Sequence, residues 1–392
     1  MPELRPRILH ITRNLPPLVG GMERLNWHIA EELSKRAEVK VIGPKGSRAL
    51  KPENVSLTEA PLKPLPLYLL VTTLKAFWMA LHWRPHVILA GSGLTAPIAW
   101  LASKLCRARS AVYLHGFDIT APSRIYQNLW ATRFKKLDHV IVNSTPTRQL
   151  ALNAGVAESR ISIIHPGVTL PQQPQPAEAI AAFKQRHGLE GKKILLSVGR
   201  LTTRKGLREF VERAMPAIVQ QEPDCVLVIV GEAPRNSLGA GIQSRESIEE
   251  AAKAHGVQNH LRFLGGITDL ALATAFESSD VHVFPVRHIP DDPEGFGMVA
   301  IEAAAHGLPT VAFATGGIVD AVSEGESGLL ITNGNYVALA ASVERVLSND
   351  NDRWKTSTTL FAEQFAWPAL GQRMADTLVV GPGRKLAEAR PY

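Results

Sequence analysis

The sequence predicts an α/β protein built from two doubly wound parallel-sheet domains in tandem. Its 392 residues are too many for one ordinary hydrophobic core. Short β-branched runs alternate with helix-like stretches, a pattern typical of a parallel sheet with helices on both faces. The alternation stops at the polar, proline-rich segment Pro171-Gln-Gln-Pro-Gln-Pro176 and then begins again. We therefore expect one domain on each side of this segment.

The first domain is expected over residues 1–170. Helices are predicted for Arg24–Lys35 and Leu65–Trp83. The second of these is long enough to cross a membrane, but Lys75 near its centre and His82 near its end favour an amphipathic helix of the domain. The predicted strands are Arg7–Ile11, Val39–Ile42, Val87–Ala90, Ala111–Leu114, His139–Asn143 and Ile161–Ile164.

The second domain is expected over residues 191–360, after an interdomain linker at residues 171–190. A tail at residues 361–380 holds a helix-like run from Phe361 to Val379. Because parallel sheets bind ligands at the carboxyl ends of their strands, two such domains are expected to face each other across a cleft. The predicted strands are Ile194–Val198, Val226–Val230, Leu261–Phe263, Val281–Phe284, Thr310–Phe313 and Gly328–Ile331.

Composition narrows the class of partner and the compartment. The net charge of +7 indicates an anionic partner, which could be a nucleotide, a nucleic acid or an acidic membrane surface. Basic residues gather at strand ends and form no single stripe, which argues against nucleic acid. The two cysteines, Cys106 and Cys225, indicate neither a disulfide framework nor a zinc site. Since the N-terminus lacks the apolar core of a signal peptide, a cytoplasmic protein is expected.

The segment from Glu294 to Glu302 is the most informative stretch of the chain. Gly295 and Gly297 remove side chains where a backbone could approach a ligand closely, and Met298 to Ala305 is a predicted helix. Amides at that helix start would face an anion, and the two carboxylates could accept hydrogen bonds from sugar hydroxyls. The alternative is a glutamate placed by the helix dipole and a second one facing water.

Three cations follow the first predicted strand of the second domain: Arg200, Arg204 and Lys205. Cations at a strand end can hold a diphosphate and neutralise the charge that grows on it as its bond to a sugar breaks. A solvated basic loop is the alternative. In the first domain, Gly20 and Gly21 precede a helix and could bring amides against a phosphate, or could simply form a tight turn.

His115 and Asp118 follow the fourth predicted strand of the first domain. A histidine at a strand end can hydrogen-bond an acceptor or exchange a proton near neutral pH, although a loop histidine is the commoner case. Gly91-Ser-Gly93-Leu-Thr-Ala96 matches a dinucleotide fingerprint, yet it follows the third strand and has no acidic residue about twenty positions on. A nicotinamide enzyme is therefore not expected.

Taken together, these residues resemble glycosyltransferase family 4 of the retaining, GT-B fold glycosyltransferases, whose two domains are Rossmann-like. The resemblance covers nearly the whole chain and rests on the order and spacing of its motifs. They are Gly20-Gly21, His115-Gly116, Gly199-Arg200, Lys205-Gly206, Val230-Gly231-Glu232, Phe263-Leu264-Gly265, Glu294 to Glu302, Gly307-Leu308-Pro309 and Gly316-Gly317. Ala233 departs from the pattern, because many relatives have glycine there, so a differently shaped turn is expected.

The resemblance implies a role for each site residue. The second domain would hold a nucleotide sugar, with Arg200 and Lys205 on its diphosphate, assisted by amides of Gly20 or Gly21. Glu294 would contact the transferred sugar and Glu302 the ribose. His115, with Asp118, would lie on the acceptor side of the first domain. Amides of four consecutive residues would assist Glu294, namely Gly295, Phe296, Gly297 and Met298. The tail helix would cross back onto the first domain.

The resemblance also implies the chemistry and the substrates. Members retain the anomeric configuration, use no cofactor beyond the sugar nucleotide and usually need no metal. Around Phe284-Pro-Val-Arg287 and Glu294-Gly295 the chain is similar to bacterial mannosyltransferases that act on phosphatidylinositol, which favours GDP-mannose over UDP-glucose or UDP-N-acetylglucosamine. The acceptor would be a glycan or a lipid-linked glycan of bacterial surface polysaccharide or glycolipid synthesis.

Two alternatives to this function stay open at this point. One is a sugar-nucleotide epimerase or phosphorylase-like enzyme on the same fold, and the other is a non-catalytic nucleotide-sugar-binding subunit. A peripheral location on the inner face of the plasma membrane is also expected, because Ser123 to Lys136 mixes basic and aromatic residues in one predicted helix. A solvated helix whose aromatic residues belong to the core is the alternative there.

Overall fold

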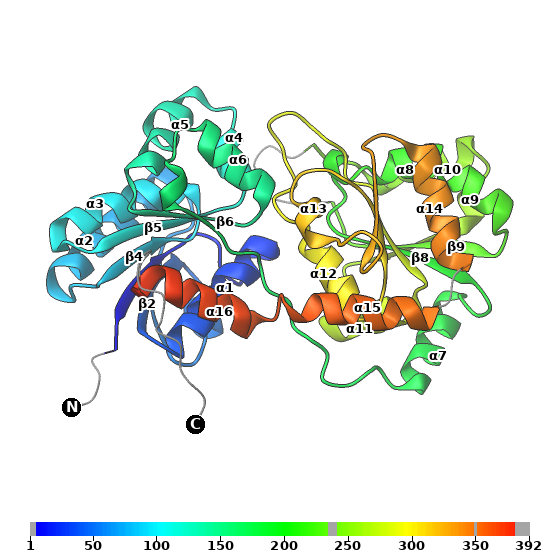
Figure 1. The fold of residues 1–392 in the computed structure, drawn as a ribbon, viewed down its shortest axis with the longest axis horizontal. Helices are drawn as coiled ribbons and strands as arrows, with labels where there is room; N and C mark the ends of the chain where they lie inside the picture. The colour runs from blue at the N-terminus through cyan, green and yellow to red at the C-terminus, as the bar shows by residue number, and fades with distance from the viewer. Residues whose placement is uncertain (1–4, 234–240, 349–350, 381–392) are drawn as a thin grey trace. The chain divides into compact units, whose positions relative to one another are not determined.

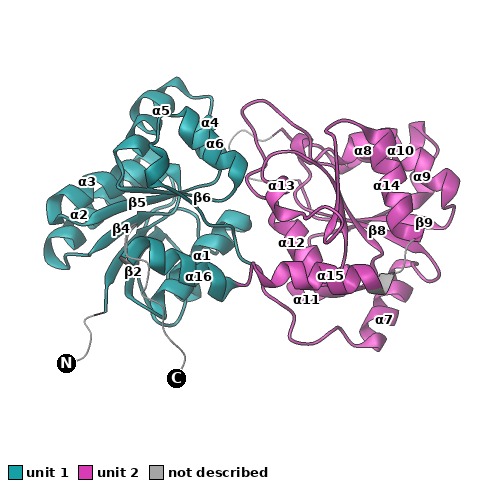
Figure 2. Cartoon of the chain, viewed as in Figure 1, with its two compact units in different colours: residues 1–167, 367–392 teal, residues 168–366 magenta. Residues whose placement is uncertain are grey.

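The structure, a computed structural model, describes residues 5–233, 241–348 and 351–380. The chain divides into two compact units (Figure 2). The first comprises residues 1–167 and 367–392, and the second comprises residues 168–366. Each unit is an α/β layer structure around its own parallel sheet (Figure 1).

The sheet of the first unit has seven parallel strands in the order β3-β2-β1-β4-β5-β6-β7. The strand order reverses at β1, which pairs with both β2 and β4. The strands are β1 (Arg7–Ile11), β2 (Glu38–Pro44), β3 (Val55–Ala60), β4 (Val87–Ala90), β5 (Arg109–Leu114), β6 (His139–Val142) and β7 (Ile161–Ile163). The helices are α1 (Gly21–Ser34), η1 (Arg48–Leu50), α2 (Leu65–His82), η2 (Gly93–Thr95), α3 (Ala96–Cys106), α4 (Phe117–Thr120), α5 (Arg124–Leu129), η3 (Ala131–Lys136), α6 (Thr145–Asn153) and η4 (Glu158–Arg160).

The sheet of the second unit has six parallel strands in the order β10-β9-β8-β11-β12-β13, and the order reverses at β8. The strands are β8 (Lys193–Val198), β9 (Cys225–Val230), β10 (Leu261–Gly265), β11 (Val281–Phe284), β12 (Thr310–Phe313) and β13 (Gly328–Ile331). The helices are α7 (Ala177–His187), η5 (Thr203–Lys205), α8 (Leu207–Arg213), α9 (Met215–Gln221), α10 (Arg245–Ala254), η6 (Gln258–His260), α11 (Asp269–Ser278), α12 (Met298–Ala305), α13 (Ile318–Ala321), α14 (Tyr336–Ser348) and α15 (Asn351–Glu363).

Side-chain alternation explains why both sheets are covered on two faces. In β8, Leu195 packs into the hydrophobic core on one face, whereas Ile194 and Leu196 pack into a separate core on the other. A parallel strand buried on both faces reads as a continuous apolar run, which is what made these strands visible in the sequence. The prediction of two parallel-sheet α/β domains is confirmed.

One strand was not predicted from the sequence. β3 lies at the edge of the first sheet and pairs only with β2. Val55 and Leu57 are buried, Ser56 and Thr58 are more exposed, and Glu59 is only partly buried. Because an edge strand with one wet face carries polar residues at alternate positions, it lacks the continuous apolar run of the central strands.

Two predicted boundaries differ from the structure. Residues 171–190, predicted as a linker, include helix α7, which packs against α11 in the second unit. The tail run from Phe361 to Val379 is broken: α15 ends at Glu363, α16 spans Trp367–Ala375, and a π-helix follows over Asp376–Val380.

Helix α16 belongs to the first unit, although it follows the second in sequence. It packs against α1, where the indole of Trp367 stacks on the imidazole of His28 at 3.9 Å between ring centroids. A Cβ at Gly371 would lie 2.6 Å from Cβ of Glu32, so only glycine permits this close approach. The chain therefore returns to its first unit at its C-terminal end.

Candidate active site

Glycines shape the turn that follows β8 in the second unit. Gly199 has a φ of 147° and Gly206 a φ of 66°. A Cβ at Gly231 would lie 2.0 Å from the Gly199 carbonyl oxygen, and a Cβ at Gly206 would lie 2.2 Å from the Pro285 carbonyl oxygen. Glycine is therefore required at positions 206 and 231. The turn after β8 is packed between the segments that follow β9 and β11.

This turn places Lys205 beside Glu294. Lys205 Nζ donates a hydrogen bond to Glu294 Oε2 at 2.8 Å, and it lies 4.6 Å from the centroid of the Phe284 ring at the end of β11. The Arg204 guanidinium is 3.7 Å from the same carboxylate oxygen. The side chains of Arg204, Lys205 and Glu294 are only 12% to 20% exposed. A partly buried cluster of two cations and one carboxylate thus lies at the carboxyl ends of β8 and β11.

The ionisation of this cluster is shifted by its burial and by its own charges. Burial acts to raise the pKa of Glu294, but Arg204, Lys205 and the hydrogen bond from Lys205 outweigh it and lower the pKa to about 2. Burial lowers the pKa of Lys205, and its contact with Glu294 opposes that shift. Glu294 is therefore ionised across the physiological range and is a weak base.

Arg204 is more central than the sequence indicated. Its guanidinium donates to the Pro293 carbonyl at 2.7 Å and lies 3.6 Å from Asp292 Oδ1. Its own carbonyl accepts a hydrogen bond from the Arg287 amide at 2.8 Å. Arg204 therefore ties the turn after β8 to the loop before Glu294. Its adjacency to Lys205 was the only signal available in the sequence.

Arg200 stands apart from this network. It is exposed, whereas Arg204 and Lys205 are largely buried. Its charge nevertheless contributes to lowering the pKa of both Glu294 and Lys205. Of the three cations predicted at this strand end, Arg200 is the one that solvent reaches most readily.

The loop after Glu294 is held by a second glycine pair. The Gly317 amide donates to the Glu294 carbonyl at 2.8 Å, and a Cβ at Gly317 would lie 2.1 Å from the Gly295 carbonyl oxygen. Gly297 has a φ of 90° and directly precedes α12. The backbone from Gly295 to Gly297 is thus fixed by close packing on Gly316 and Gly317.

Phe296 and Glu302 lie on either side of the start of α12. The Phe296 side chain is 2% exposed in a core cluster and packs on Phe365, so only its backbone is placed to meet a ligand. Because α12 begins at Met298, the half-buried Glu302 is about one turn into the helix. Met298 is the first helical residue and packs partly against the same core.

In the first unit, Gly20 and Gly21 lie at the start of α1. Gly20 is the residue before the helix, and its carbonyl accepts the first helical hydrogen bond from the Arg24 amide at 3.1 Å. A Cβ at Gly20 would lie 2.4 Å from Glu23 Oε2. The other oxygen of Glu23 accepts from Asn14 Nδ2 at 2.8 Å. The glycine pair therefore belongs to a tight turn that opens a fourteen-residue helix.

His115 lies at the end of β5 with its ring buried. Its Nε2 donates to the Gly91 carbonyl at 2.9 Å, which fixes this proton on Nε2. The same carbonyl accepts from Asn26 Nδ2 at 3.3 Å, and Asn26 Oδ1 accepts from His10 Nε2 at 3.0 Å. Asp118 accepts the backbone amide of His115 at 3.1 Å, so it supports the turn. The imidazole and the Asp118 carboxylate share no hydrogen bond among those described.

The dinucleotide-like glycines are explained by packing. A Cβ at Gly91 would lie 2.0 Å from Asn26 Oδ1, and a Cβ at Gly93 would lie 2.5 Å from the Tyr126 hydroxyl. Both glycines therefore admit neighbouring side chains of the first unit. The fingerprint match is a packing feature, as its position after the third predicted strand indicated.

Ser123 to Lys136, predicted as one basic and aromatic helix, is two pieces. Helix α5 ends at Leu129 and the 3-10 helix η3 begins at Ala131. Phe134 is fully buried, and the indole of Trp130 donates to the Leu94 carbonyl at 2.9 Å. The prediction of a single helix is wrong, and these two aromatic side chains serve the fold of the first unit.

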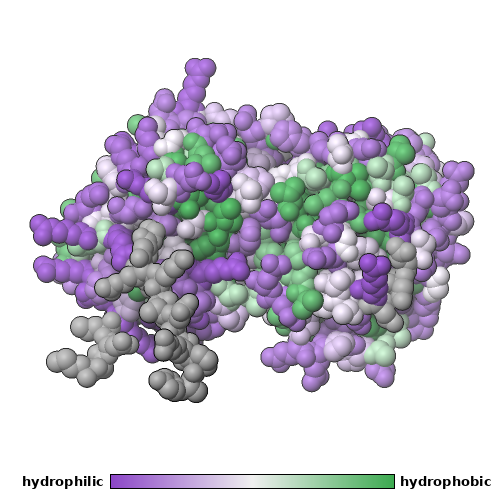
Figure 3. All heavy atoms as spheres, viewed as in Figure 1, coloured by the Kyte–Doolittle hydropathy of each residue, from purple (hydrophilic) through white to green (hydrophobic). Residues whose placement is uncertain are grey.

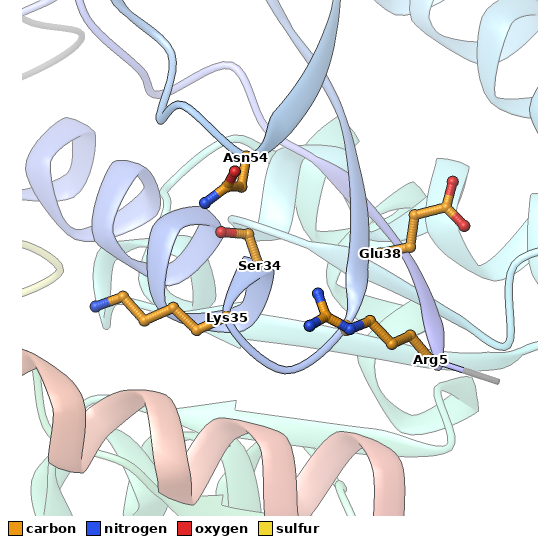
Figure 4. Close-up of a pocket in the computed structure, with 6 residues that line it drawn as sticks. Arg5, Ser34, Lys35, Glu38 and Asn54 are labelled. Atoms are coloured by element: carbon orange, nitrogen blue, oxygen red, sulfur yellow. The ribbon is translucent and has the colours of Figure 1, made fainter. Parts of the chain in front are cut away.

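A surface cavity of the first unit lies at the opposite edge of its sheet from His115 (Figure 4). It is lined at the amino ends of β1, β2 and β3, and none of the predicted site residues lines it. The lining residues are Arg5, Ser34, Lys35, Ala37, Glu38 and Asn54. The turn expected to differ at Ala233 continues into residues 234–240, which lie outside the described residues.

Comparison with known proteins relates the two units to separate family models. Residues 19–171 match the model described as Glycosyltransferase Family 4, and residues 180–359 match the model described as Glycosyl transferases group 1. The two matches lie on either side of residues 172–179 and together reach most of the chain.

Three similar proteins illustrate the range of the likeness. The GDP-mannose-dependent alpha-(1-6)-phosphatidylinositol monomannoside mannosyltransferase of Mycolicibacterium smegmatis is 26% identical, over 91% of this chain and 97% of its own. The D-inositol 3-phosphate glycosyltransferase of Geodermatophilus obscurus is 31% identical over 62% of this chain, a match that spans 51% of that relative. The crystal structure of Anabaena HepE in complex with UDP and glucose superposes with a TM-score of 0.77 at 21% identity, covering 95% of this chain and 99% of that one.

Proposed function

Because the chain belongs to the GT-B glycosyltransferases, with a family 4 domain followed by a group 1 domain, we propose that it transfers a hexose with retention of configuration and without a metal ion. The proposed donor is GDP-mannose, ahead of UDP-glucose and UDP-N-acetylglucosamine. The proposed acceptor is a glycan or lipid-linked glycan of bacterial surface polysaccharide or glycolipid synthesis. The proposed location is the cytoplasm, with peripheral attachment to the inner face of the plasma membrane.

The contact between Lys205 and Glu294 is the observation that carries this proposal. An ammonium group has three donors, so Lys205 can hold Glu294 and still donate to a phosphate oxygen. Its partial burial strengthens its interaction with charge that develops on a departing diphosphate. The exposed Arg200 supplies a second cation at the same strand end.

Glu294 is suited to binding and poorly suited to proton abstraction. Its pKa of about 2 reflects two close cations that hold it as a carboxylate. A base with so low a pKa takes a hydroxyl proton weakly near neutral pH. We therefore assign Glu294 to a hydroxyl of the transferred sugar and leave the acceptor proton to the departing phosphate, as the family resemblance implies.

The choice of GDP-mannose rests on relatives and on one segment of the chain. The mycobacterial relative, which matches over nearly its whole length, is described as GDP-mannose-dependent. Phe284 to Arg287 is a segment whose sequence resembles mannosyltransferases. It borders the turn that carries Lys205, because Gly206 of that turn lies close to the Pro285 carbonyl.

The test is a transfer assay with the full chain. Labelled GDP-mannose, UDP-glucose and UDP-N-acetylglucosamine are each incubated with a bacterial lipid extract containing phosphatidylinositol, with and without EDTA. We expect label from GDP-mannose in the lipid fraction, the anomeric configuration of the donor in the product, and no effect of EDTA. Release of free sugar alone from every donor, an inverted product, or loss of transfer in EDTA would each contradict part of the proposal.

A further inference from the structure

Helix α2 presents a stripe of large apolar side chains to solvent. The stripe consists of Leu67, Leu70, Leu74, Trp78 and Leu81, whose spacing of three and four residues places them on one face. Each of these side chains is between 41% and 60% exposed. Since an α-helix rises about 1.5 Å per residue, the stripe is about 20 Å long.

The opposite face of α2 is buried in the first unit. This burial explains why the helix packs there, but it does not explain why the exposed stripe is apolar. Tyr68, Thr72, Ala76, Met79 and Ala80 are buried. Three of them, Ala76, Met79 and Ala80, join the core that covers one face of the first sheet. A helix with one buried face normally turns polar residues outward, whereas a helix that is apolar all round indicates a second apolar environment.

By length and composition alone, α2 is the one helix of the described residues that could cross a membrane. Its buried face instead makes it a layer of the first unit. Crossing a bilayer would require α2 to leave the sheet whose core it completes. A position at the surface of a bilayer keeps that core and still covers the stripe.

Helix α3 extends the apolar surface and adds charge to it. It packs against α2, and its Leu101 and Leu105 are exposed. Lys104 is exposed between these two leucines. Green spheres appear between purple ones at the left edge of Figure 3, where Figure 1 places α2 and α3.

A group of cations borders this surface next to α3. The Arg133 guanidinium lies 5.4 Å and the Lys136 ammonium 5.2 Å from the centroid of the Trp100 ring. Arg107, just past the end of α3, is exposed, as is Lys136. Cations beside exposed leucines are the arrangement expected where side chains enter the apolar boundary of an anionic bilayer and their neighbours reach its headgroups.

Acidic residues are missing from this part of the sequence. Residues 60–117, which include all of α2 and α3, contain neither aspartate nor glutamate, in a chain with 36 acidic residues. The same stretch contains six cations: Lys63, Lys75, Arg84, Lys104, Arg107 and Arg109. The two helices therefore contribute cations and no carboxylate of their own, and Asp138 of a neighbouring segment lies near enough to Lys104 to interact with its charge.

We propose that the outer face of α2 and α3, bordered by Lys104, Arg107 and Lys136, docks the protein on an anionic lipid surface. The inference deepens the proposed function and rests on it for its purpose, which is to bring a lipid-linked acceptor to the first unit. Both α2 and η2, which leads into α3, begin just past strand ends at the same edge of the sheet as His115. The start of the stripe at Leu67 thus adjoins the edge assigned to the acceptor, whereas Lys104 and Arg107 lie at the other end of the helices. The stripe replaces Ser123–Lys136, apart from Lys136 itself, as the proposed contact.

Vesicle co-sedimentation of the full chain tests the proposal. The probes are vesicles of phosphatidylcholine alone and vesicles of phosphatidylcholine and phosphatidylglycerol in equal parts. We expect binding to the second kind only, weakened by added salt, and weakened by about tenfold or more in L70E/L74E. The matched control is L270E/L360E, which places the same charges at leucines of the second unit that are 71% and 67% exposed.

Any of the following outcomes would contradict the proposed docking face. Absence of wild-type binding to the anionic vesicles, equal binding of L70E/L74E, or an equal loss in the control would overturn it. So would sedimentation showing that the wild type self-associates through this face and that only L70E/L74E is monomeric. A GDP titration of the same variants separates the two proposals. Loss of vesicle binding with intact GDP binding bears only on the docking face. Absence of GDP binding in the wild type bears only on the proposed function.

Discussion

The carboxyl edges of the two sheets carry opposite kinds of polar chemistry. In the second unit, Arg204 and Lys205 surround the carboxylate of Glu294. In the first unit, the buried ring of His115 is linked to Asn26 through the Gly91 carbonyl, and the Asp118 carboxylate accepts the His115 amide. Clustered cations suit a diphosphate, whereas hydrogen-bonding groups around a buried histidine suit a hydroxyl-bearing acceptor. The two similar folds thus differ where their ligands are proposed to bind.

Replacing Lys205 is expected to break the charged edge and to have the largest effect. Lys205→Ala removes a cation that is proposed to stabilise the departing diphosphate, so kcat should fall by about 100-fold. The matched control is Lys192→Ala, which removes another ion-paired lysine of the same unit, 2.6 Å from Asp224 at the surface. Steady-state rates with the best donor provide the measurement. If both variants lose activity equally, Lys205 has no special role.

Replacing His115 tests the carboxyl edge of the first sheet. His115→Ala removes a ring that the Gly91 carbonyl holds in place, and kcat/KM for the acceptor should fall by about tenfold. The affinity for GDP should stay unchanged, because the donor is assigned to the other unit. His139→Gln serves as a control, since His139 lies in the same sheet and contacts only Ser162 among the described side-chain hydrogen bonds. A large change in GDP affinity would contradict the division of roles.

Replacing Glu302 distinguishes nucleotide binding from chemistry. Glu302→Ala should weaken GDP binding by about fivefold, the loss of one hydrogen-bonded ribose contact, while kcat at saturating donor changes little. Calorimetry with GDP provides the measurement. An unchanged dissociation constant would remove Glu302 from the ribose site and leave it as a helix residue of α12.

The pH dependence of stability is expected to show the smallest effect. The folded pKa of Glu294, about 2, is lower than its ordinary value of 4.5, so its pairing stabilises the fold above pH 4.5 and is lost as pH falls toward 2. The difference in free energy of unfolding between wild type and Glu294→Gln should therefore be largest near neutral pH. It should shrink as the pH falls from 4.5 toward 2. Urea unfolding at several pH values measures it, with Asp224→Asn, an exposed ion pair, as a control that should change little. A difference that grows on acidification would contradict the assignment.

The sequence predicts the strands better than it predicts their surroundings. Val87–Ala90, Val281–Phe284, Thr310–Phe313 and Gly328–Ile331 are strands with the predicted bounds, because buried parallel strands carry continuous apolar runs. β3 was missed because an edge strand has polar residues at alternate positions. Helix α7 was missed because the proline-rich segment before it suggested a longer linker.

The candidate site was predictable in its membership but not in its geometry. Lys205 was singled out because it follows a strand end, and Glu294 because a glycine pair and a predicted helix follow it. The strand order makes the ends of β8 and β11 neighbours. The contacts of Arg204 with Asp292 and Pro293 depend on how a loop folds back, which no local pattern encodes. The burial of Phe296 depends on Phe365, almost seventy residues away. Such tertiary contacts leave the backbone amide of Phe296 as the part that the predicted role requires, and no local pattern shows where its side chain packs.

The central claim is that the charged edge of the second unit holds the donor. It is tested most directly by calorimetric titration of GDP and UDP into the wild type, Lys205→Ala and His115→Ala. We predict saturable binding of one nucleoside diphosphate to the wild type, affinity at least about tenfold weaker in Lys205→Ala, and wild-type affinity in His115→Ala. The claim that the second unit holds the donor would be contradicted if neither nucleotide bound the wild type, or if the wild type and Lys205→Ala had equal affinity.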